Sequence, residues 1–286
     1  MAPAPSALTT IQAAVDEATR QLSTTGTDTP RLDAEVLMAF ELRWTRARLL
    51  AHWDEQLPPG ARDHYAGLAG RRAAGEPVAY IRNLKEFLGL ELYVDPRVLI
   101  PRPETELLVT RAVAWLRSHA DARVVDVGTG SGAIAVGILS SCPGVCLIAT
   151  DVSEEALEVA SLNAQRHSVH PELLAGSLLE PVQGRIDLVV ANLPYLNRDE
   201  YENLRHTSIA YEPRQALTDD ADGLRWFGAL LDQAQAKLAP GGCILLEIGS
   251  GQPAALQELV RRRLPDFQAA IYPDYAGLPR VLELSR

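Results

Sequence analysis

The chain has 286 residues, of which 47% are hydrophobic and 22% are charged. This length and composition allow a buried core and suit one large domain, or a large domain with a small one. The net charge of −10 argues against a protein that holds a long nucleic acid by counterion release, although a local basic patch can coexist with an acidic total.

No apolar run approaches the roughly 18 residues of a membrane span. The first ten residues also lack the basic start and apolar stretch of a secretion signal. We therefore expect a cytoplasmic protein without membrane association. Three scattered cysteines, Cys142, Cys146 and Cys243, are too few for a disulfide framework and have no histidine pair at zinc spacing. We interpret them as small buried residues and expect no metal site.

The N-terminal part of the chain has the pattern of a helical bundle. From Thr9 to about Gly75, apolar residues recur at helical spacing. Pro30 suits the first turn of a second helix. We predict that residues 1–75 form four or five helices. Residues 76–104 then read as a linker with a hairpin, whose strands are expected at Phe87–Leu90 and Leu92–Val94.

Residues 105–286 alternate short apolar runs with helical stretches, which predicts a second, larger domain. Runs that are apolar on both faces indicate a mainly parallel sheet covered by helices. The runs are Val124–Val127, Cys146–Asp151, Ile186–Asn192 and Cys243–Ile248. Two later runs, Phe267–Tyr272 and Val281–Leu284, predict a terminal hairpin.

A glycine-rich turn follows the first of these strands, in the segment Asp126–Gly132. Glycines suit a tight strand-to-helix turn whose backbone approaches a ligand. The spacing is G-x-G-x-G, whereas dinucleotide enzymes use G-x-G-x-x-G. About twenty residues later Asp151 ends the next strand, where a carboxylate accepts both hydroxyls of a ribose. The alternative role for Asp151, capping the helix that begins near Glu154, suits Ser153 better.

The segment Asn192–Tyr195 follows the fourth strand, at the same sheet edge as the glycine turn. It resembles the N-P-P-Y motif of enzymes that methylate planar amino or amide nitrogens. The Asn192 side-chain oxygen and the Leu193 carbonyl would accept the two N–H bonds of such a nitrogen and aim it at a methyl group. Tyr195 would pack against the planar group. Leu193 replaces the first proline and still supplies a carbonyl, while it precedes Pro194 and so favours extended geometry.

These features together resemble the class I S-adenosylmethionine (SAM)-dependent methyltransferase fold. The resemblance implies a Rossmann-like, mostly parallel seven-stranded sheet, with a catalytic segment formed by Asn192, Leu193, Pro194 and Tyr195, which also binds the substrate. It also implies that Gly176–Leu178 borders the adenine. The residues implied to bind SAM are Gly128, Thr129, Gly130, Ser131, Gly132, Asp151, Leu178, Asn192 and Phe87.

A longer motif narrows the resemblance to one family. The segment Leu99–Glu106, L-I-P-R-P-E-T-E, resembles closely the I-P-R-P-x-T-E signature of the release-factor glutamine methyltransferases, the PrmC/HemK family. Further segments in family order include Tyr211–Leu217 and Glu247–Gln252. The resemblance implies methylation of the glutamine amide N5 in the Gly-Gly-Gln loop of a class 1 peptide chain release factor. It also implies that the helical domain helps to dock that protein.

Two other readings stay open. One is an N-methyltransferase acting on an exocyclic amino group of DNA or RNA, which the acidic total disfavours. The other is a binding protein that has kept the fold without catalysis. We expect a monomer that forms no stable nucleic-acid complex. Asp219, Asp220 and Asp222 lack the spacing of a calcium loop, and we interpret them as a solvated loop and helix cap. We interpret the short arginine runs at residues 71–72 and 261–263 as solvated helix faces.

Overall fold

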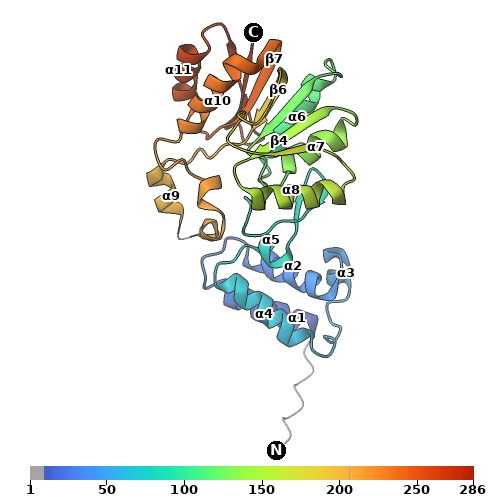
Figure 1. The fold of residues 1–286 in the computed structure, drawn as a ribbon. Helices are drawn as coiled ribbons and strands as arrows, with labels where there is room; N and C mark the ends of the chain where they lie inside the picture. The colour runs from blue at the N-terminus through green and yellow to red at the C-terminus, as the bar shows by residue number, and fades with distance from the viewer. Residues whose placement is uncertain (1–9, 206) are drawn as a thin grey trace, which may run out of the picture. The chain divides into compact units, whose positions relative to one another are not determined.

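The structure of the chain is a computed structural model that describes residues 10–205 and 207–286 (Figure 1). The chain divides into two compact units, Met1–Asn83 and Leu84–Arg286. The boundaries predicted at residues 75 and 104 stay predictions of domain organisation. Residues 1–9, most of the stretch on which the absence of a secretion signal was predicted, lie outside the described residues. No helix in the described part of the chain is both long enough and apolar enough to span a membrane.

The first unit is helical, which confirms the predicted bundle. Its described helices are α1 (Ile11–Leu22), α2 (Pro30–Leu42), α3 (Arg46–Ala51), α4 (Ala61–Ala73) and α5 (Val78–Arg82). Apolar residues from all five helices form one buried cluster, which includes Val15, Leu37, Leu49, Leu68 and Ile81. Pro30 lies in the first turn of α2, as predicted.

One charged residue of this unit is not solvated as predicted. The Arg72 side chain is mostly buried, and its Nε lies 2.7 Å from Oδ2 of Asp33. A second guanidinium nitrogen donates to Thr27 at 2.7 Å. The interpretation of Arg72 as a solvated face is therefore wrong, because its partners lie about forty residues earlier in the chain and no local pattern reveals them. The second arginine run, by contrast, is exposed at the end of α11 (Pro253–Arg263).

The second unit begins with a two-stranded hairpin, which lies two residues earlier than predicted. Its strands are β1 (Lys85–Phe87) and β2 (Leu90–Leu92), and Phe87 pairs with Leu90. Leu88 and Gly89 form the turn, with φ of 52° and 73°. Two positive φ values at the central positions are the geometry of a tight hairpin turn. The prediction placed Leu88 inside a strand because leucine seldom adopts this conformation.

A seven-stranded sheet forms the centre of the second unit, in the order β5-β4-β3-β6-β7-β9-β8. The strands are β3 (Arg123–Val127), β4 (Cys146–Asp151), β5 (Glu172–Ala175), β6 (Ile186–Ala191), β7 (Leu238–Glu247), β8 (Gln268–Pro273) and β9 (Pro279–Ser285). Strands β5, β4, β3, β6 and β7 are parallel, whereas β9 is antiparallel to β7 and to β8. The mostly parallel sheet and the terminal hairpin are both confirmed.

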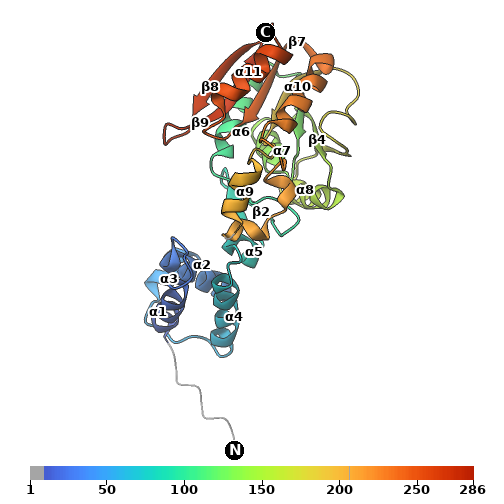
Figure 2. The same ribbon diagram turned by 90° about the vertical axis from the view of Figure 1, so that its left-hand side faces the viewer.

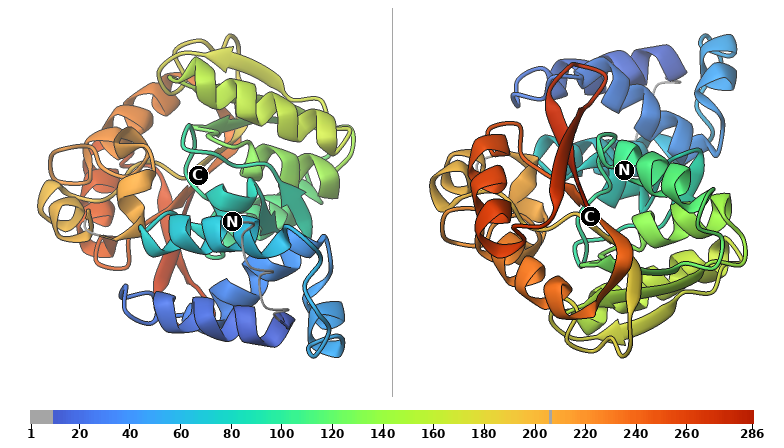
Figure 3. Two further views of the ribbon diagram at one scale, coloured as in Figure 1. Left: turned by 90° about the horizontal axis from the view of Figure 1, so that it is seen from below. Right: turned by 90° about the horizontal axis from the view of Figure 1, so that it is seen from above.

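Helices cover both faces of this sheet (Figures 1 and 3). One layer contains α6 (Thr105–Leu116), α7 (Ala133–Ser141) and α8 (Glu154–Arg166), and the other contains α10 (Arg225–Lys237) and α11. Successive residues of each strand point to opposite faces. Val124 accordingly packs in the cluster with α6 and α7, whereas Val125 packs in the cluster with α10 and α11. A short helix, α9 (Arg198–Leu204), and two 3₁₀ turns, η1 (Ser208–Tyr211) and η2 (Arg214–Ala216), connect β6 to α10 (Figure 2).

Two sequence interpretations need correction in this unit. Cys243 is buried and Cys142 is half-buried, but Cys146 is exposed because it is the first residue of β4, where the strand enters the sheet. Asp219 is also not solvated: it is 4% exposed and accepts hydrogen bonds from the backbone N–H groups of Ala221, Gly223 and Arg225. Asp219 thus accepts the first N–H of α10, whereas the N-cap residue itself is Leu224, which makes no side-chain cap hydrogen bond.

Candidate active site

The register of the parallel strands places two predicted site residues close to each other. Val127 of β3 lies between Thr150 of β4 and Ala191 of β6 in the sheet. The next residue on β4 is Asp151, its last, and the residue that directly follows β6 is Asn192. Both therefore lie at the carboxyl edge of the sheet, one on each side of β3, and ligands bind at this edge in parallel α/β sheets.

The glycine turn leaves β3 between these two residues. The backbone N–H groups of Gly128 and Thr129 donate to the Thr150 carbonyl at 2.8 and 2.9 Å, so the turn is fixed to the neighbouring strand. Gly128 and Gly130 have φ of 71° and 54°. Side chains rarely adopt such values, which explains the glycines at these two positions. The Gly130 N–H points to Asp151 and donates to its Oδ2 at 2.9 Å.

Asp126 supports the turn from inside the protein. It is fully buried, and its Oδ2 accepts hydrogen bonds from the Thr129 hydroxyl at 2.6 Å and from the Ala135 N–H at 3.2 Å. Burial raises the pKa of Asp126 to about 7. Its Oδ1 has no hydrogen-bond partner among the described residues. Asp126 thus connects the turn to the first residues of α7 and does not face the cavity.

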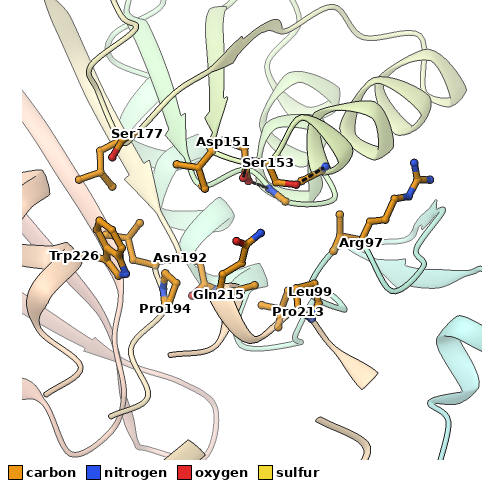
Figure 4. Close-up of a pocket in the computed structure, with 18 of the residues that line it drawn as sticks. Arg97, Leu99, Asp151, Ser153, Ser177, Asn192, Pro194, Pro213, Gln215 and Trp226 are labelled. Atoms are coloured by element: carbon orange, nitrogen blue, oxygen red, sulfur yellow. Dashed lines mark hydrogen bonds between the residues drawn. The ribbon is translucent and has the colours of Figure 1, made fainter. Parts of the chain in front are cut away.

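The cavity at this sheet edge has about 930 Å³ of empty space, including its open mouth (Figure 4). Of the predicted site residues, seven line it: Gly128, Gly130, Asp151, Leu178, Asn192, Leu193 and Pro194. Figure 4 shows Asp151 and Ser177 on one side of the cavity and Asn192, Pro194 and Gln215 on the other.

Asp151 is suited to hold a ribose. Its carboxylate is half-buried, and burial raises its pKa, while the N–H groups of Ser153 and Gly130 donate to its two oxygens at 2.9 Å and oppose that rise. Each carboxylate oxygen can accept more than one hydrogen bond, so both can still accept a ligand hydroxyl. Ser153 caps α8 by accepting from the Ala156 N–H, as predicted, which leaves Asp151 free of that task.

Three predicted residues of the glycine turn have structural contacts instead. Thr129 and Ser131 are about 95% buried and do not line the cavity. Gly132 is the N-cap residue of α7, with φ of 79°, and a Cβ there would lie 3.1 Å from both the Cα and the Cβ of Ala160 in α8. Glycine at 132 therefore permits the close packing of α7 against α8.

The structure does not bring Phe87 to the cavity. Its side chain is 1% exposed and belongs to the apolar cluster under α6 and α7. A Cβ at Gly137 of α7 would lie 3.6 Å from the Phe87 ring. Because the hairpin turn begins at Leu88, Phe87 is the last residue of β1 and points into the core. The predicted contact between Phe87 and SAM has no support in this geometry.

Asn192 and Leu193 also connect the first cavity to a second one. Asn192 and Leu193 line both, and Tyr195 lines the second. Leu193 is 4% exposed, and its Cδ2 would lie 3.7 Å from a Cβ at Gly128, so leucine fills the space between this segment and the glycine turn. Burial raises the pKa of Tyr195 to about 12, so the ring is a neutral phenol at neutral pH.

A glutamine that the sequence interpretation gave no role fastens the segment that follows Asn192. The Gln252 side-chain amide donates to the carbonyls of Tyr195 and Gly223 at 3.1 and 3.0 Å. Its oxygen accepts from the Gly249 N–H at 2.8 Å. These three bonds connect the segments that contain Tyr195, Gly223 and Gly249, and so they fix the position of the Tyr195 backbone.

Several cavity residues were not predicted as site residues. They are Arg97, Val98, Leu99, Val152, Ser153, Ala156, Pro213, Gln215, Ala216 and Trp226. Gly176 and Ser177 also line the cavity, and they belong to the segment that was expected to border the adenine. Two of the segments containing the unpredicted residues, Leu99–Glu106 and Tyr211–Leu217, were recognised as motifs, which was a usable signal. Glu212 shows why they belong together: its carboxylate accepts from the Ile100 N–H at 3.0 Å and from Arg102 at 2.6 Å. Trp226 had no such signal, because it lies within an ordinary amphipathic helix.

Both parts of the chain match known families. Residues 13–82 match the PrmC N-terminal domain, and residues 104–224 match the methyltransferase small domain. A relative from Bordetella pertussis, named release factor glutamine methyltransferase, is 45% identical over 88% of this chain and 93% of its own length. A relative of the same name from Moorella thermoacetica is 39% identical over 95% of this chain and 96% of its own.

The chain belongs to the release factor glutamine methyltransferase family. It is a SAM-dependent methyltransferase, and SAM is its methyl donor. Solved structures agree on the fold. The hMettl16 catalytic domain has a TM-score of 0.55 at 17% identity and covers 76% of this chain and 81% of that one. A methyltransferase from Pyrococcus furiosus has a TM-score of 0.50 at 19% identity, over 77% of this chain and 98% of that one. The predicted class I methyltransferase fold is confirmed.

Proposed function

We propose that this family member transfers the methyl group of SAM to the side-chain amide N5 of the glutamine in the Gly-Gly-Gln motif of a class 1 peptide chain release factor. The observation that carries the proposal is that one cavity is lined both by Asp151, a carboxylate suited to a ribose, and by the Asn192 amide, in a chain of this family. SAM supplies an electrophilic methyl group on a positively charged sulfur.

The donor side of the site follows from the residues that line it. We assign the ribose hydroxyls to Asp151 and the amino-acid part of SAM to the turn at Gly128 and Gly130. Leu178 and Ser177 line the part of the cavity assigned to adenine. Leu178 is 8% exposed and has φ of 51°, so it offers an apolar packing surface there.

The acceptor side must orient a poor nucleophile. The amide nitrogen of glutamine shares its lone pair with the carbonyl group, so reaction requires that the nitrogen be held in line with the methyl group. Asn192 Oδ1 and the Leu193 carbonyl accept its two N–H bonds, and Tyr195 packs beside the planar amide. So held, the nitrogen lone pair would be aligned with the methyl carbon that SAM supplies, and the nitrogen would release one proton to water after transfer.

The second cavity suits the incoming glutamine side chain. It shares Asn192 and Leu193 with the first cavity and adds Tyr195, Ile209 and Leu217. Such a mixture of apolar wall and a few polar groups is typical of small-ligand sites. We assign the SAM side to the first cavity and the glutamine side to the second, with Asn192 at the junction.

The release factor is a protein partner, and we propose that the helical unit contributes to docking it. Release factors act on the ribosome, so the proposed place of action is the cytoplasm. We still predict that the protein is a monomer and that it forms no stable complex with nucleic acid. The acidic net charge of −10 supports the protein substrate over the nucleic-acid alternative.

The test is methyl transfer from labelled SAM to a full-length release factor, beside a copy whose Gly-Gly-Gln glutamine is changed to alanine. We expect label on the first protein and none on the second. The Asn192→Ala variant should lose turnover while SAM binding, measured by calorimetry, stays nearly unchanged. Label on nucleic acid, with none on either release factor, would refute the proposal and favour the nucleic-acid alternative.

A further inference from the structure

A buried chain of hydrogen bonds holds the Asn192 side chain from the side away from the cavity. Asn192 Nδ2 donates to the Thr105 hydroxyl at 3.2 Å. The Thr105 hydroxyl donates to Glu247 Oε2 at 2.6 Å. Thr105 begins α6 and Glu247 ends β7, and they are 3% and 1% exposed. Neither residue lines either cavity.

The chemistry of the three groups fixes the direction of these bonds. An ionised carboxylate has acceptors and no donor, so Thr105 must use its single hydroxyl proton on Glu247. The Thr105 hydroxyl can then only accept a hydrogen bond from Asn192, and the NH₂ group is the donor of the Asn192 side chain. The Asn192 amide is therefore held with its nitrogen towards Thr105 and its oxygen available on the opposite side.

We propose that Thr105 and Glu247 are positioning residues that orient the Asn192 amide, so that its oxygen faces the acceptor nitrogen of the substrate. This inference rests on the proposed function, because it concerns an acceptor that carries two N–H bonds. A reversed Asn192 amide would point its own N–H bonds at those of the substrate, and the two groups would repel each other. The direction of the chain thus decides whether Asn192 can hold a planar NH₂ group.

The burial of Glu247 supports a role beyond folding. Its neighbours in the chain, Leu246 and Ile248, are fully buried in the apolar core. A carboxylate at such a position is costly unless its oxygens are hydrogen-bonded. Glu247 Oε1 has no hydrogen-bond partner in the described part of the chain. A native structure that keeps such an unsatisfied group calls for an explanation. The bond that Thr105 donates to the other oxygen, Oε2, gives a reason to keep a carboxyl group at this position.

The charge state of Glu247 is sensitive to pH near neutrality. Burial raises its pKa to about 7, and the bond from Thr105 opposes this rise. The ionisable or charged groups that face it come from the segment after β6, from β9 and from the segment before α6: Tyr195, Arg280, Arg102 and Glu104. Once protonated, Glu247 can donate to Thr105, and the direction of the chain is no longer imposed. We expect kcat to fall as the pH decreases through about 7, while Glu247→Gln removes this dependence.

The first experiment compares three threonine variants. Thr105→Val keeps the shape of the side chain and removes the hydroxyl, whereas Thr105→Ser keeps the hydroxyl. Thr110→Val is the matched control, because Thr110 lies on the exposed side of the same helix and donates to the Glu106 carbonyl. For release-factor methylation we expect kcat of Thr105→Val to fall about tenfold or more, from the loss of one hydrogen bond and of alignment. Thr105→Ser should stay within about threefold of the wild type, Thr110→Val should be unchanged, and KM for SAM should be similar in all.

A second measurement needs no turnover. Infrared spectroscopy follows the carbonyl band of a protonated carboxyl group as the pH is changed in the absence of SAM. Subtraction of the Glu247→Gln spectrum isolates Glu247 from other buried carboxyl groups, such as Asp126. The Thr105→Val variant should shift the midpoint of the Glu247 band to higher pH, because its carboxylate loses a hydrogen-bond donor.

The possible results separate this inference from the proposed function. If the wild-type chain leaves every release factor unlabelled, the proposed function fails. If the wild type is active and Thr105→Val stays within twofold of it, or if Thr105→Ser is as slow as Thr105→Val, the positioning role is refuted. An unchanged midpoint of the Glu247 band in Thr105→Val refutes it as well, whatever the substrate is.

Discussion

Replacement of Gly132 by alanine tests whether the glycine turn serves packing at one end and ligand binding at the other. The new Cβ would lie 3.1 Å from the Cα and Cβ of Ala160, at φ of 79°. The left-handed conformation costs about 1–2 kcal/mol. Overpacking of a buried contact adds about 1–3 kcal/mol. We therefore expect Gly132→Ala to lower the free energy of unfolding of its unit by about 2–5 kcal/mol, or roughly 4–20 °C in Tm.

Gly144→Ala is the matched control for this prediction. Gly144 also has a positive φ, of 94°, but its Cβ would meet no atom within 4 Å. The control should therefore show the conformational cost alone, about 1–2 kcal/mol. Thermal unfolding followed by circular dichroism gives both values. Equal losses in the two variants would refute the close packing of α7 on Ala160. The difference in unfolding free energy between Gly132→Ala and the wild type should be the same with and without saturating SAM. That result would show that the substitution disturbs packing and leaves SAM binding intact.

Three other changes test the site and its supports. Asp151→Asn should weaken SAM binding by about 10–100-fold, because hydrogen bonds to a charged group contribute about 1.5–3 kcal/mol, and calorimetry would show it; an unchanged affinity would remove the ribose role. Burial raises the pKa of Asp126 above its unfolded value, so the folded state holds this proton up to about pH 7. Wild-type stability should therefore fall relative to Asp126→Asn as the pH rises from about 4 to about 7. The prediction is contradicted if the urea midpoints of the two proteins differ by the same amount at every pH in that range. Glu212→Ala should destabilise the unit by about 1–3 kcal/mol, because it leaves the Ile100 N–H and the partly exposed Arg102 without their buried acceptor; an unchanged free energy of urea unfolding would contradict it.

Much of the fold was predictable because buried parallel strands have a simple signature. The apolar run Cys146–Asp151 coincides with β4, and Ile186–Asn192 coincides with β6 except for its last residue. Both strands are covered on two faces, so nearly every side chain is apolar. The glycine turn and the residues just after these strands were predictable for the same reason, since the sheet edge follows directly from where the strands end.

Other features depended on contacts that no local pattern contains. The hairpin was misplaced because Leu88, a residue that normally extends a strand, adopts a left-handed turn conformation. Phe87 consequently points into the core. Arg72 looked solvated because its partner Asp33 is distant in the chain. The contact of Thr105 with Glu247 joins residues 142 positions apart, so only the folded sheet shows it.

Because β3 lies between β4 and β6, the sheet itself fixes the distance between the ends of the two outer strands. Asp151 ends β4 and Asn192 directly follows β6, and these two strands are two spacings of about 4.8 Å apart, roughly 10 Å in all. Backbone hydrogen bonds set this span, and the loops that meet the substrate do not. Sequence changes in those loops can therefore alter which acceptor is admitted without altering the reach from donor to acceptor.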